Sequence, residues 1–406
     1  MLYNKTYNLF RSSPEFLRKL LYLVPVRYRL GGKDFVETYN FLKKSEFWSK
    51  EKLVSYQEKK LQQLLNHAIK NIPYYSDIDL KYDDPFKNLK LFPVVDKDTI
   101  RNNKEEFISN NISKKNTFKV TTGGTTGDPL EFRLDNSSYG KEWAFKAIAW
   151  GRVGYEPGDK LVTFRGVNFN NADKGIYWQD NPIYNMFEMS PFHMNEKNLP
   201  RYIEKIKKIG PKFLHGYPSA LTNLAKFIKK RDYDFPPIKA VLPASENLYE
   251  HQRKLLGEVF DCRVFSFYGL SERVIMSPEC EHSNHYHAFP QYGITEILDE
   301  DGNEVDNGKK GELVGTGFLS RYMPFIRYRT GDYGKVSKEK CKCGRNHQII
   351  KDLVGKGGRE SKIIKKDGST FTLTPLYYTM HGSTLNNVDR IQFYQKKRGE
   401  IILRIV

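Results

Sequence analysis

The sequence is poor in cysteine and has no long apolar run, and each shortage excludes a class of protein. Four cysteines in 406 residues cannot make the disulfide framework of a secreted scaffold, so we expect reduced thiols and a cytoplasmic protein. The apolar stretch Leu20 to Val24 is cut short by Pro25 and Arg27, and no small-residue cleavage site follows it. Because a membrane-spanning helix needs roughly 18 consecutive apolar residues, none is expected.

Acidic residues are also scarce relative to basic ones. The 48 Asp and Glu face 66 Lys and Arg, which gives a formal charge of +18. Such a charge can favour nucleic acid, anionic membranes or anionic substrates, but the lysines are spread along the whole chain, as on a solvated surface. We therefore expect no nucleic-acid partner. The basic, aromatic segment from Met1 to Leu30 is interpreted as an amphipathic helix packed on its own domain, with peripheral contact to an anionic membrane as the alternative.

A run of small and hydroxyl-bearing residues stands out against this background. In order, it consists of Thr121, Thr122, Gly123, Gly124, Thr125, Thr126 and Gly127. Glycines allow positive φ and close backbone approach, so the N–H groups of such a loop can turn toward phosphate oxygens while the hydroxyls add hydrogen bonds. The loop lacks the lysine of a Walker A motif. A flexible hairpin turn is the alternative for such a loop taken alone.

Helix-like and strand-like segments alternate through the middle of the chain. Apolar residues at helical spacing predict helices over 36–72, 138–152, 199–209, 220–230 and 249–260. Short apolar runs predict strands over 160–164, 211–216, 238–243 and 262–267. We expect Ser219 to cap the helix that follows it. The alternation favours a mostly parallel sheet covered on both faces, with ligands at the carboxyl ends of its strands.

That rule directs attention to three loops, at 215–219, 244–247 and 268–272. From about residue 288 the segments become shorter and hairpin-like, which predicts a β-rich sub-domain over about 288–354. Gly355 to Gly358 form the clearest boundary, so we expect one domain over 1–354 and a second over 355–406.

Taken in order, the loops resemble the motifs of one enzyme family. The resemblance is carried by 121–127, His-Gly-Tyr-Pro-Ser at 215–219, Pro-Ala-Ser-Glu at 243–246, Phe-Tyr-Gly-Leu-Ser-Glu at 267–272, and Pro-Phe-Ile-Arg-Tyr-Arg-Thr-Gly-Asp at 324–332. Five motifs in this order resemble the adenylate-forming, acyl-CoA synthetase-like enzymes, and more narrowly the phenylacetate-CoA ligase and capsular polysaccharide CapK branch.

The resemblance implies a fold. It is an α/β fold with a large, multi-layer adenylation domain, in which mixed sheets are flanked by helices, and with the β-rich sub-domain. A short, incomplete α+β lid domain would follow.

The resemblance also implies roles for individual residues. The loop from Thr121 to Gly127 would hold the phosphates of ATP, with Thr122 and Thr126 in the catalytic set. Glu272 would be catalytic and would hold Mg²⁺, a hard cation that favours carboxylate and phosphate oxygens. Tyr268 would pack against adenine and Asp332 would accept hydrogen bonds from the ribose. The remaining nucleotide contacts would come from Ser245, Glu246, Gly269 and Arg345.

Three cysteines and a histidine suggest a metal site. Cys280 and His287 lie close in sequence, and Cys341 and Cys343 bring two more thiols together. A Cys₃His set suits structural zinc, and His282 or His285 could replace His287 as the fourth ligand. Relatives with a similar Cys-x-Cys-Gly-Arg element often carry structural zinc. Free reduced cysteines in a loop are the alternative.

The carboxyl-terminal part departs from the family pattern. The Gly-Arg-Asp hinge element is represented by Gly358-Arg359-Glu360, and Gly355-Lys356 competes for the same alignment. Relatives carry near their end a lysine that contacts the acyl phosphate. Lys396 and Lys397 are the last lysines here and lie too early to match it. Either the sequence is a fragment, or the carboxyl-terminal domain is reduced and the activity is impaired or completed by a partner.

These observations predict an ATP-dependent enzyme that activates a small carboxylic acid as an acyl-adenylate and passes it to CoA or to a sugar or amine acceptor. The CapK-like features favour capsule or surface polysaccharide synthesis, and phenylacetate activation is the alternative within the class. Apolar and aromatic side chains at 176–178, 187 and 192 could line an acyl pocket or simply belong to the core. The alternative from another class is a catalytically reduced protein that binds nucleotide and a partner. The sequence leaves the oligomeric state open.

Overall fold

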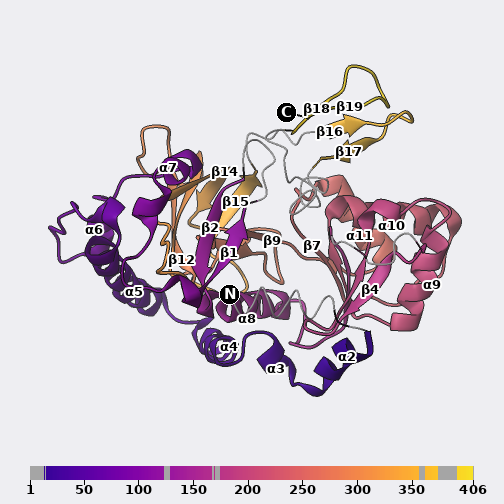
Figure 1. Cartoon of the computed structure of the whole chain (residues 1–406), viewed down its shortest axis with the longest axis horizontal. Coiled ribbons are helices and arrows are strands. Elements are labelled where there is room, and N and C mark those ends of the chain that lie inside the picture. Colours follow the sequence, from indigo (N-terminus) through magenta and orange to yellow (C-terminus); the bar gives the residue numbers. More distant parts are fainter. Residues whose placement is uncertain are drawn as a thin grey trace.

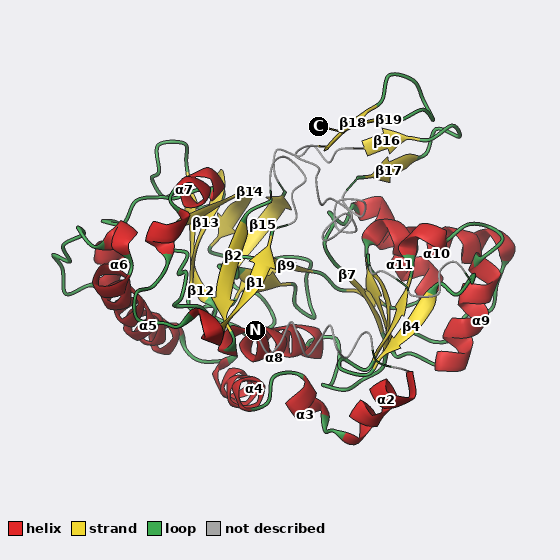
Figure 2. Cartoon of the chain, viewed as in Figure 1, coloured by secondary structure: helices red, strands yellow, loops and turns green. Residues whose placement is uncertain are grey.

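The computed structural model describes residues 13, 15–122, 129–166, 169, 174–355, 362–373 and 391–405. Two lobes, each built on a sheet, lie side by side and are joined along one margin by long helices (Figure 1). Helices lie on the outer side of each lobe and the two sheets lie toward the middle (Figure 2). No helix in the described part of the chain is both long enough and apolar enough to cross a membrane.

The first lobe contains a six-stranded sheet in the order β4-β5-β3-β6-β7-β8. All neighbours are parallel except β4, which runs antiparallel to β5 at one edge. The strands are β3 (Leu161–Phe164), β4 (Trp178–Asn181), β5 (Met186–Met189), β6 (Phe213–Gly216), β7 (Ala240–Pro243) and β8 (Arg263–Val264).

Helices cover both faces of this sheet, as the alternation of elements predicted. Alternate residues of the buried strands belong to different cores: Val162 and Leu214 pack with α9, α10 and α11, whereas Leu161 and Phe213 pack with α4 and α8. This period of two follows from the pleat of a strand. The helices are α4 (Lys33–Ser45), α8 (Ser137–Gly151), α9 (Leu199–Ile209), α10 (Pro218–Arg231) and α11 (Glu250–Phe260).

The second lobe contains an antiparallel sheet in the order β11-β15-β14-β13-β12. A third core joins this sheet to the hairpin β1–β2 and to the amino-terminal helices. The strands are β1 (Thr117–Thr121), β2 (Glu131–Asp135), β11 (Tyr286–Ala288), β12 (Gly293–Leu298), β13 (Lys310–Gly317), β14 (Tyr328–Ser337) and β15 (Gln348–Val354). The helices are α5 (Lys50–Asn71), α6 (Pro85–Leu89) and α7 (Lys97–Asn102), with short 3-10 turns η2 (Pro73–Tyr75), η3 (Lys104–Phe107) and η4 (Lys114–Asn116).

The remaining elements lie at the lobe junction and at the two ends of the chain. The hairpin of β9 (Phe267–Gly269) and β10 (Met276–Pro278) connects the lobes in sequence, and η5 (Pro191–His193) follows β5. The amino-terminal elements are α2 (Glu15–Lys19), η1 (Leu20–Leu23) and α3 (Val26–Arg29). The carboxyl-terminal elements are β16 (Lys362–Ile364), β17 (Thr370–Thr372), β18 (Ile391–Tyr394) and β19 (Ile402–Ile405), which form two separate hairpins.

A pair of glycines allows the helices that join the lobes to meet. A Cβ atom built on Gly31 would lie 2.4 Å from Cα of Gly140, which is far inside van der Waals contact. Gly31 precedes α4 and Gly140 lies on α8, so the two helix backbones come together where neither residue has a side chain.

Three predictions of local structure were wrong. The helix predicted over 36–72 is two helices, because Ser49 caps α5 by accepting a hydrogen bond from the Lys52 N–H. Ser219 does not cap α10, whose N-cap is Tyr217. The strand predicted over 262–267 is shorter: only Arg263 and Val264 join the parallel sheet, and Phe267 pairs in β9 with β10.

Candidate functional site

The carboxyl ends of three neighbouring strands meet at one edge of the parallel sheet. Phe164, Gly216 and Pro243 are paired across β3, β6 and β7, so the loops that follow them lie side by side. Gly216 has φ of +143°, and a Cβ there would lie 2.4 Å from the Phe164 carbonyl oxygen, so a side chain is excluded. The loops predicted at 215–219 and 244–247 therefore come together.

Two predicted residues of the loop after β7 are already bound to protein groups. Ser245 has a positive φ of 69°, and its hydroxyl oxygen accepts a hydrogen bond of 2.9 Å from Arg165. Glu246 accepts two hydrogen bonds of 3.0 Å, from the backbone N–H and the hydroxyl of Ser219 in the first turn of α10. A carboxylate at this position is stabilised because the first N–H groups of a helix have no partner within the helix and carry a partial positive charge. Glu246 therefore holds the loop against α10.

Tyr268 and Asp332 come together across the lobe junction. The Tyr268 hydroxyl on β9 donates a hydrogen bond of 2.8 Å to Oδ2 of Asp332 on β14. Burial, and then the Asp332 charge, raise the pKa of Tyr268 well above its ordinary value, so the hydroxyl stays protonated and donates. The adjacent Gly269 pairs with Met276 in the β9–β10 hairpin. The predicted adenine and ribose positions are thus neighbours.

Glu272 lies beside the same group. Its buried carboxylate accepts a hydrogen bond of 2.7 Å from the hydroxyl of Tyr328, at the start of β14. Burial, and then the charge of Glu272, raise the pKa of Tyr328 above its ordinary value. Glu272 also adds to the negative field at Tyr268. The site therefore combines two carboxylates with two tyrosines that stay protonated.

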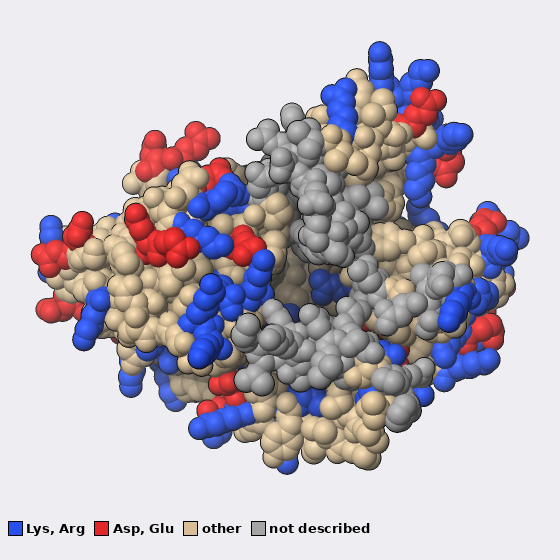
Figure 3. All heavy atoms as spheres, viewed as in Figure 1, with Lys and Arg blue, Asp and Glu red and all other residues tan. Residues whose placement is uncertain are grey.

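Gly355 brings the end of β15 to this group. A Cβ built on Gly355 would lie 3.3 Å from Oδ1 of Asn247 and 3.6 Å from Oδ1 of Asp332. The predicted loop 244–247, Asp332 and the predicted domain boundary thus meet at one point. On this face the molecule is hollowed between the two lobes, and Lys or Arg atoms lie inside the hollow (Figure 3).

The Thr/Gly segment is only partly described. Thr121 ends β1, where it pairs with Glu131 of β2, and the backbone and hydroxyl of Thr122 both bond to Leu130, with the hydroxyl accepting from its N–H at 2.9 Å. The loop is therefore the connection of an antiparallel hairpin. Gly123, Gly124, Thr125, Thr126 and Gly127 lie outside the described residues.

A group of cations near this edge was not predicted from the sequence. Lys146 on α8 and Arg273 share one carboxylate, with nitrogen-to-oxygen distances to Glu142 of 3.5 and 3.9 Å, and the Tyr292 hydroxyl donates to the same carboxylate at 2.6 Å. Arg165, which follows β3, adds a further positive charge. Glu142 and Lys146 are four residues apart on α8, but no spacing in the sequence relates the three cations, because they lie on different elements.

A row of buried polar side chains crosses the face of the parallel sheet that packs on α8. Glu188, Thr163 and His215 are paired in register across β5, β3 and β6. Thr163 Oγ1 and His215 Nδ1 are 2.9 Å apart, and Glu188 accepts hydrogen bonds of 2.6 and 2.8 Å from Gln179 and Asn181. Burial, helped by Arg165 and Lys146, lowers the pKa of His215 well below its ordinary value. His215 is therefore neutral at pH 7.

The predicted cysteine and histidine set is assembled in space. The ligand atoms of Cys280, His287, Cys341 and Cys343 all lie within 4.8 Å of one another. Sγ of Cys280 is 3.5 Å from Sγ of Cys341, and Sγ of Cys343 is 3.9 Å from Nδ1 of His287. Ligands of a tetrahedral zinc ion lie about 3.5 to 3.8 Å apart, so the donor set fits that metal. His287, rather than His282 or His285, completes the group.

Arg345 is not brought to the Tyr268 and Asp332 group. Its guanidinium forms a bidentate pair with Glu281, at 2.6 and 2.8 Å, and bonds to Glu46 at 2.6 Å. These contacts tie the loop beside the cysteine cluster to the end of α4. The predicted nucleotide contact of Arg345 gains no support from this geometry.

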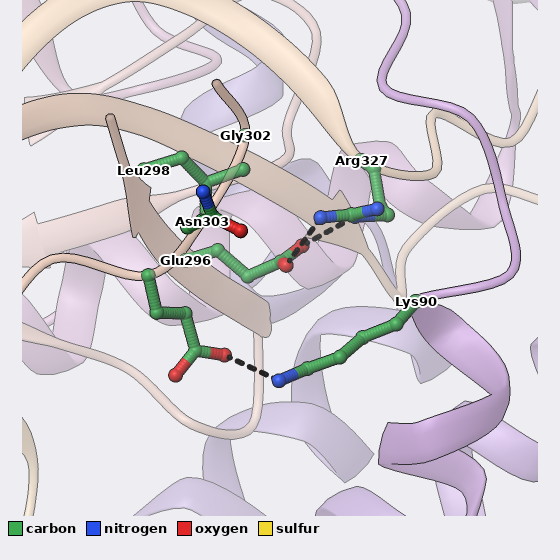
Figure 4. A pocket seen from close by; sticks show the side chains of 7 residues that line it. Lys90, Glu296, Leu298, Gly302, Asn303 and Arg327 are labelled. Atoms are coloured by element: carbon green, nitrogen blue, oxygen red, sulfur yellow. Dashed lines mark hydrogen bonds and ion pairs between the residues drawn. The ribbon is translucent and has the colours of Figure 1, made fainter. Parts of the chain in front are cut away.

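A polar pocket of about 240 Å³ lies elsewhere, beside β12. Its charged side chains pair with each other: Arg327 with Glu296 at 3.1 Å and Lys90 with Glu304 at 3.5 Å (Figure 4). None of the predicted site residues lines it. Its charges are already matched, so it calls for no ligand.

The comparisons with known proteins agree with the arrangement described above. No protein-family model matches the chain. It is 27% identical over 364 residues to protein CapK of Staphylococcus aureus, covering 87% of this chain and 78% of that protein. It is 26% identical over 321 residues to a phenylacetate-coenzyme A ligase of Thermus thermophilus, covering 76% and 71%.

Solved structures give the same fold. A 2-hydroxyisobutyryl-CoA ligase in complex with 2-HIB-AMP and CoA superposes with a TM-score of 0.61 at 18% identity, covering 89% of this chain and 80% of that one. A second structure of that ligase, in the postadenylation state, gives 0.60 at 16% identity. Together with the two curated relatives, this fold supports the resemblance of the chain to the adenylate-forming superfamily, and within it to the branch of CapK and the phenylacetate-CoA ligases.

Proposed function

We propose that this chain is an AMP-forming carboxylate ligase. It would join a carboxylic acid to the AMP part of ATP and pass the acyl group to CoA or to another acceptor. The observation that carries the proposal is the meeting of Tyr268, Asp332 and Glu272 with the loop after β7 at the edge where a parallel sheet binds ligands. The name of the phenylacetate-coenzyme A ligase among the relatives supports the same class of reaction.

The chemistry requires positioning and charge neutralisation more than a protein nucleophile. A carboxylate oxygen of the acid attacks the α-phosphorus of ATP, an acyl–O–P bond forms, and the bond to the leaving pyrophosphate breaks. Asp332 would accept hydrogen bonds from the ribose, and Tyr268 would lie against the base. Lys146 and Arg165 would offset the negative charge of the reactants. In a second step, a thiol or amine attacks the acyl carbon and AMP leaves.

Glu272 is the residue that would hold Mg²⁺. A buried carboxylate next to a protonated hydroxyl donor offers the hard oxygen ligand that this cation prefers. When bound, the ion would neutralise charge on the phosphates. The phosphate-binding role of Thr121 to Gly127 remains a proposal from the sequence, as do the catalytic roles of Thr122 and Thr126.

The buried polar row favours a polar acid over an aryl acid. Glu188, Thr163 and His215 face α8 from the sheet, next to the cations at its carboxyl edge. These groups already bond to one another and to Gln179 and Asn181, so an apolar ring packed beside them would add no hydrogen bond. A hydroxy acid or a sugar acid would add polar groups that can form further hydrogen bonds with the row. Such a substrate suits a role in capsule or surface polysaccharide synthesis, which the CapK relative suggests, better than phenylacetate.

The apolar and aromatic side chains that were predicted to line an acyl pocket do not gather at one place. Trp178 and Phe187 pack against the core beneath α9, where Arg201 and Lys205 lie over their rings. Ile176 and Phe192 are exposed. The positions of Trp178 and Phe187 favour a structural role for these two rings.

The experiment is carboxylate-dependent exchange of pyrophosphate into ATP, with matched aryl, hydroxy, sugar and amino acids as substrates. We expect exchange with polar acids and at least a hundredfold loss in Glu272→Gln, in line with losses on removing a charge stabiliser. Glu258→Gln, on the exposed face of α11, is the matched control and should leave exchange unchanged. ATP binding without exchange for any acid would instead support the nucleotide-binding protein of reduced activity.

The cysteine and histidine cluster would hold structural zinc. Four protein ligands leave no open position for catalysis, so the metal would tie the β10–β11 segment to the loop between β14 and β15. All four cysteines of the chain, Cys262 outside the cluster included, are free thiols, which fits a reducing compartment such as the cytoplasm. We also retain the division into residues 1–354 and 355–406 as a proposal, because the chain leaves β15 at Gly355.

A further inference from the structure

The segment from Leu17 to Arg29 exposes a concentration of large apolar side chains. It contains Leu17, Leu20, Tyr22, Leu23 and Tyr28, which are five of the fifteen such side chains that are exposed in the described part of the chain. Leu23 is 81% exposed and Leu20 is 55% exposed. Gathered apolar surface of this kind marks an interaction site, whereas single exposed leucines are ordinary.

This segment, which we call the amino-terminal ledge, is fixed to the body of the molecule. The Tyr22 hydroxyl donates a hydrogen bond of 2.7 Å to Asp180 on β4, and the Arg29 guanidinium donates to the carbonyl oxygen of Pro182. Val26 packs onto the backbone at Gly158, where its methyl carbon would be 3.1 Å from a Cβ. These contacts attach one side of the ledge to the rest of the molecule, while Leu20 and Leu23 are exposed.

The ledge is also positively charged. Between Leu17 and Arg29 the sequence has four basic residues and no acidic one: Arg18, Lys19, Arg27 and Arg29. Lys19 and Arg27 are exposed beside the leucines. In Figure 1, α2 and α3 lie along the lower margin of the molecule, away from the carboxyl-terminal strands, and Figure 3 shows largely uncharged surface at that margin with basic side chains near it.

An anionic lipid bilayer fits this combination better than other partners. A second copy of the ledge would bring like charges together, which opposes association. Nucleic acid would pair with the cations but would leave the leucines in water. A bilayer with anionic headgroups takes both features, because leucines enter the acyl boundary while Lys and Arg contact the headgroups.

We propose that the amino-terminal ledge docks this chain reversibly on an anionic membrane surface, with Leu20 and Leu23 inserted at the interface and Lys19 and Arg27 on the headgroups. The hollow between the lobes opens on the face of Figure 3, whereas the ledge lies on its margin, so docking would leave the hollow accessible. This binding is independent of the proposed ligase activity.

The test is co-sedimentation of the full chain with vesicles of phosphatidylcholine, either alone or mixed with phosphatidylglycerol. We expect binding to the mixed vesicles only, and weaker binding as salt is raised. Leu20→Ser with Leu23→Ser should lower the partition coefficient by at least about tenfold. Lys19→Gln with Arg27→Gln should lower it by about 25-fold, since each basic residue contributes about fivefold at such a surface.

The matched control lies at the other end of the molecule. Ile402 and Leu403 on β19 are 53% and 41% exposed beside Arg404, so Ile402→Ser with Leu403→Ser removes comparable apolar surface outside the ledge. It should leave vesicle binding unchanged. Equal binding to neutral vesicles, or full binding by both ledge variants, would overturn the proposal. So would an oligomer in solution, without lipid, that disappears when Leu20 and Leu23 are replaced.

Discussion

Asp332 tests whether the site binds a nucleotide. Its carboxylate lies next to the Tyr268 hydroxyl and to the backbone of Gly355. Replacing it by Asn keeps the size of the side chain and removes the charge that would strengthen hydrogen bonds from ribose hydroxyls. We expect Asp332→Asn to weaken ATP binding by at least tenfold, as measured by calorimetry.

Tyr333 gives a control on the same strand. It is the next residue along β14 and points to the opposite face, where Lys310 lies over its ring. Tyr333→Phe should leave ATP affinity unchanged. An unaltered affinity in Asp332→Asn would remove Asp332 from the nucleotide site.

His215 predicts a dependence of stability on pH. The folded state keeps its pKa well below the ordinary value, because the ring is buried beside Thr163 and Trp150 and near Arg165 and Lys146. Below about pH 6.5 the unfolded chain takes up a proton that the folded chain does not, so stability is present above that pH and is lost as pH falls. The loss should reach about 1 kcal/mol one pH unit lower.

The measurement is urea unfolding at pH 7 and pH 5.5. His215→Gln should reduce the difference in unfolding free energy between the two pH values by about 1 kcal/mol. His251→Gln is the control, since that ring lies on α11 outside the core. An undiminished difference in His215→Gln would show that other groups cause the acid sensitivity.

At the residue scale, the sequence predicted members of the site that carry a motif, and missed those that do not. Tyr268, Glu272 and Asp332 could be chosen because each stands at a fixed place in a motif. Lys146 and Arg165 could not, because they reach the site from a helix and from a strand end that share no sequence pattern. Their contribution depends on tertiary packing alone.

At the scale of elements, Glu246 links the loop after β7 to the start of α10. Its two hydrogen bonds to Ser219 satisfy a backbone N–H that the helix itself cannot pair. We expect Glu246→Gln to lower the free energy of unfolding by about 1 kcal/mol, through loss of the charge at the helix start. Chemical denaturation would measure this.

The same variant separates two roles of Glu246. If the residue only holds the loop, ATP affinity should change less in Glu246→Gln than in Asp332→Asn. Glu250→Gln, in the first turn of α11, is the comparison for a charge at another helix start. A large loss of ATP affinity with unchanged stability would assign Glu246 to the nucleotide instead.

Elements whose apolar residues recur at one regular spacing were predicted well. Elements that form only through pairing with a neighbouring segment were not. The helix Leu199–Ile209 was predicted residue for residue, because its apolar side chains follow the helical period between polar ones. The hairpin β4–β5 was missed: Trp178-Gln-Asp-Asn is a polar strand at a sheet edge, whose pairing with β5 depends on a neighbour. Ser219 failed as a cap because Pro218 already occupies the first helical position.

At the scale of the whole molecule, the proposed zinc site should act on stability rather than on chemistry. Its ligands come from two segments of the β-rich part, and Arg345 beside it pairs with Glu46 at the end of α4. We expect about one zinc per chain by elemental analysis, and a lower melting temperature after chelation. Cys341→Ser should lose the metal, whereas Cys262→Ser, outside the cluster, should keep it. A metal-free chain of unchanged melting temperature would contradict the proposal.

The overall architecture could be predicted from the sequence, because the alternation of helices and strands and the order of the loop motifs together limit the possible folds. Alternating helices and strands predicted the parallel sheet, and the hairpin-like segments after residue 288 predicted the antiparallel one. The way the sheets face each other was not predictable from either pattern, since it depends on contacts such as Tyr268 with Asp332. For the proposed zinc site the sequence named His287 with His282 or His285 as substitutes, and the fold places His287 beside the three thiols.

The meeting of Gly31 and Gly140 also has an evolutionary consequence. A methyl group on either residue would overlap the segment that carries the other glycine. A substitution at one position therefore cannot be compensated at the other, which is already the smallest residue. Both positions are therefore held at the smallest residue for as long as α4 crosses α8 in this way. In a homologue where one of these glycines is replaced, we expect the two helices to lie farther apart. The other position should then also accept a residue larger than glycine.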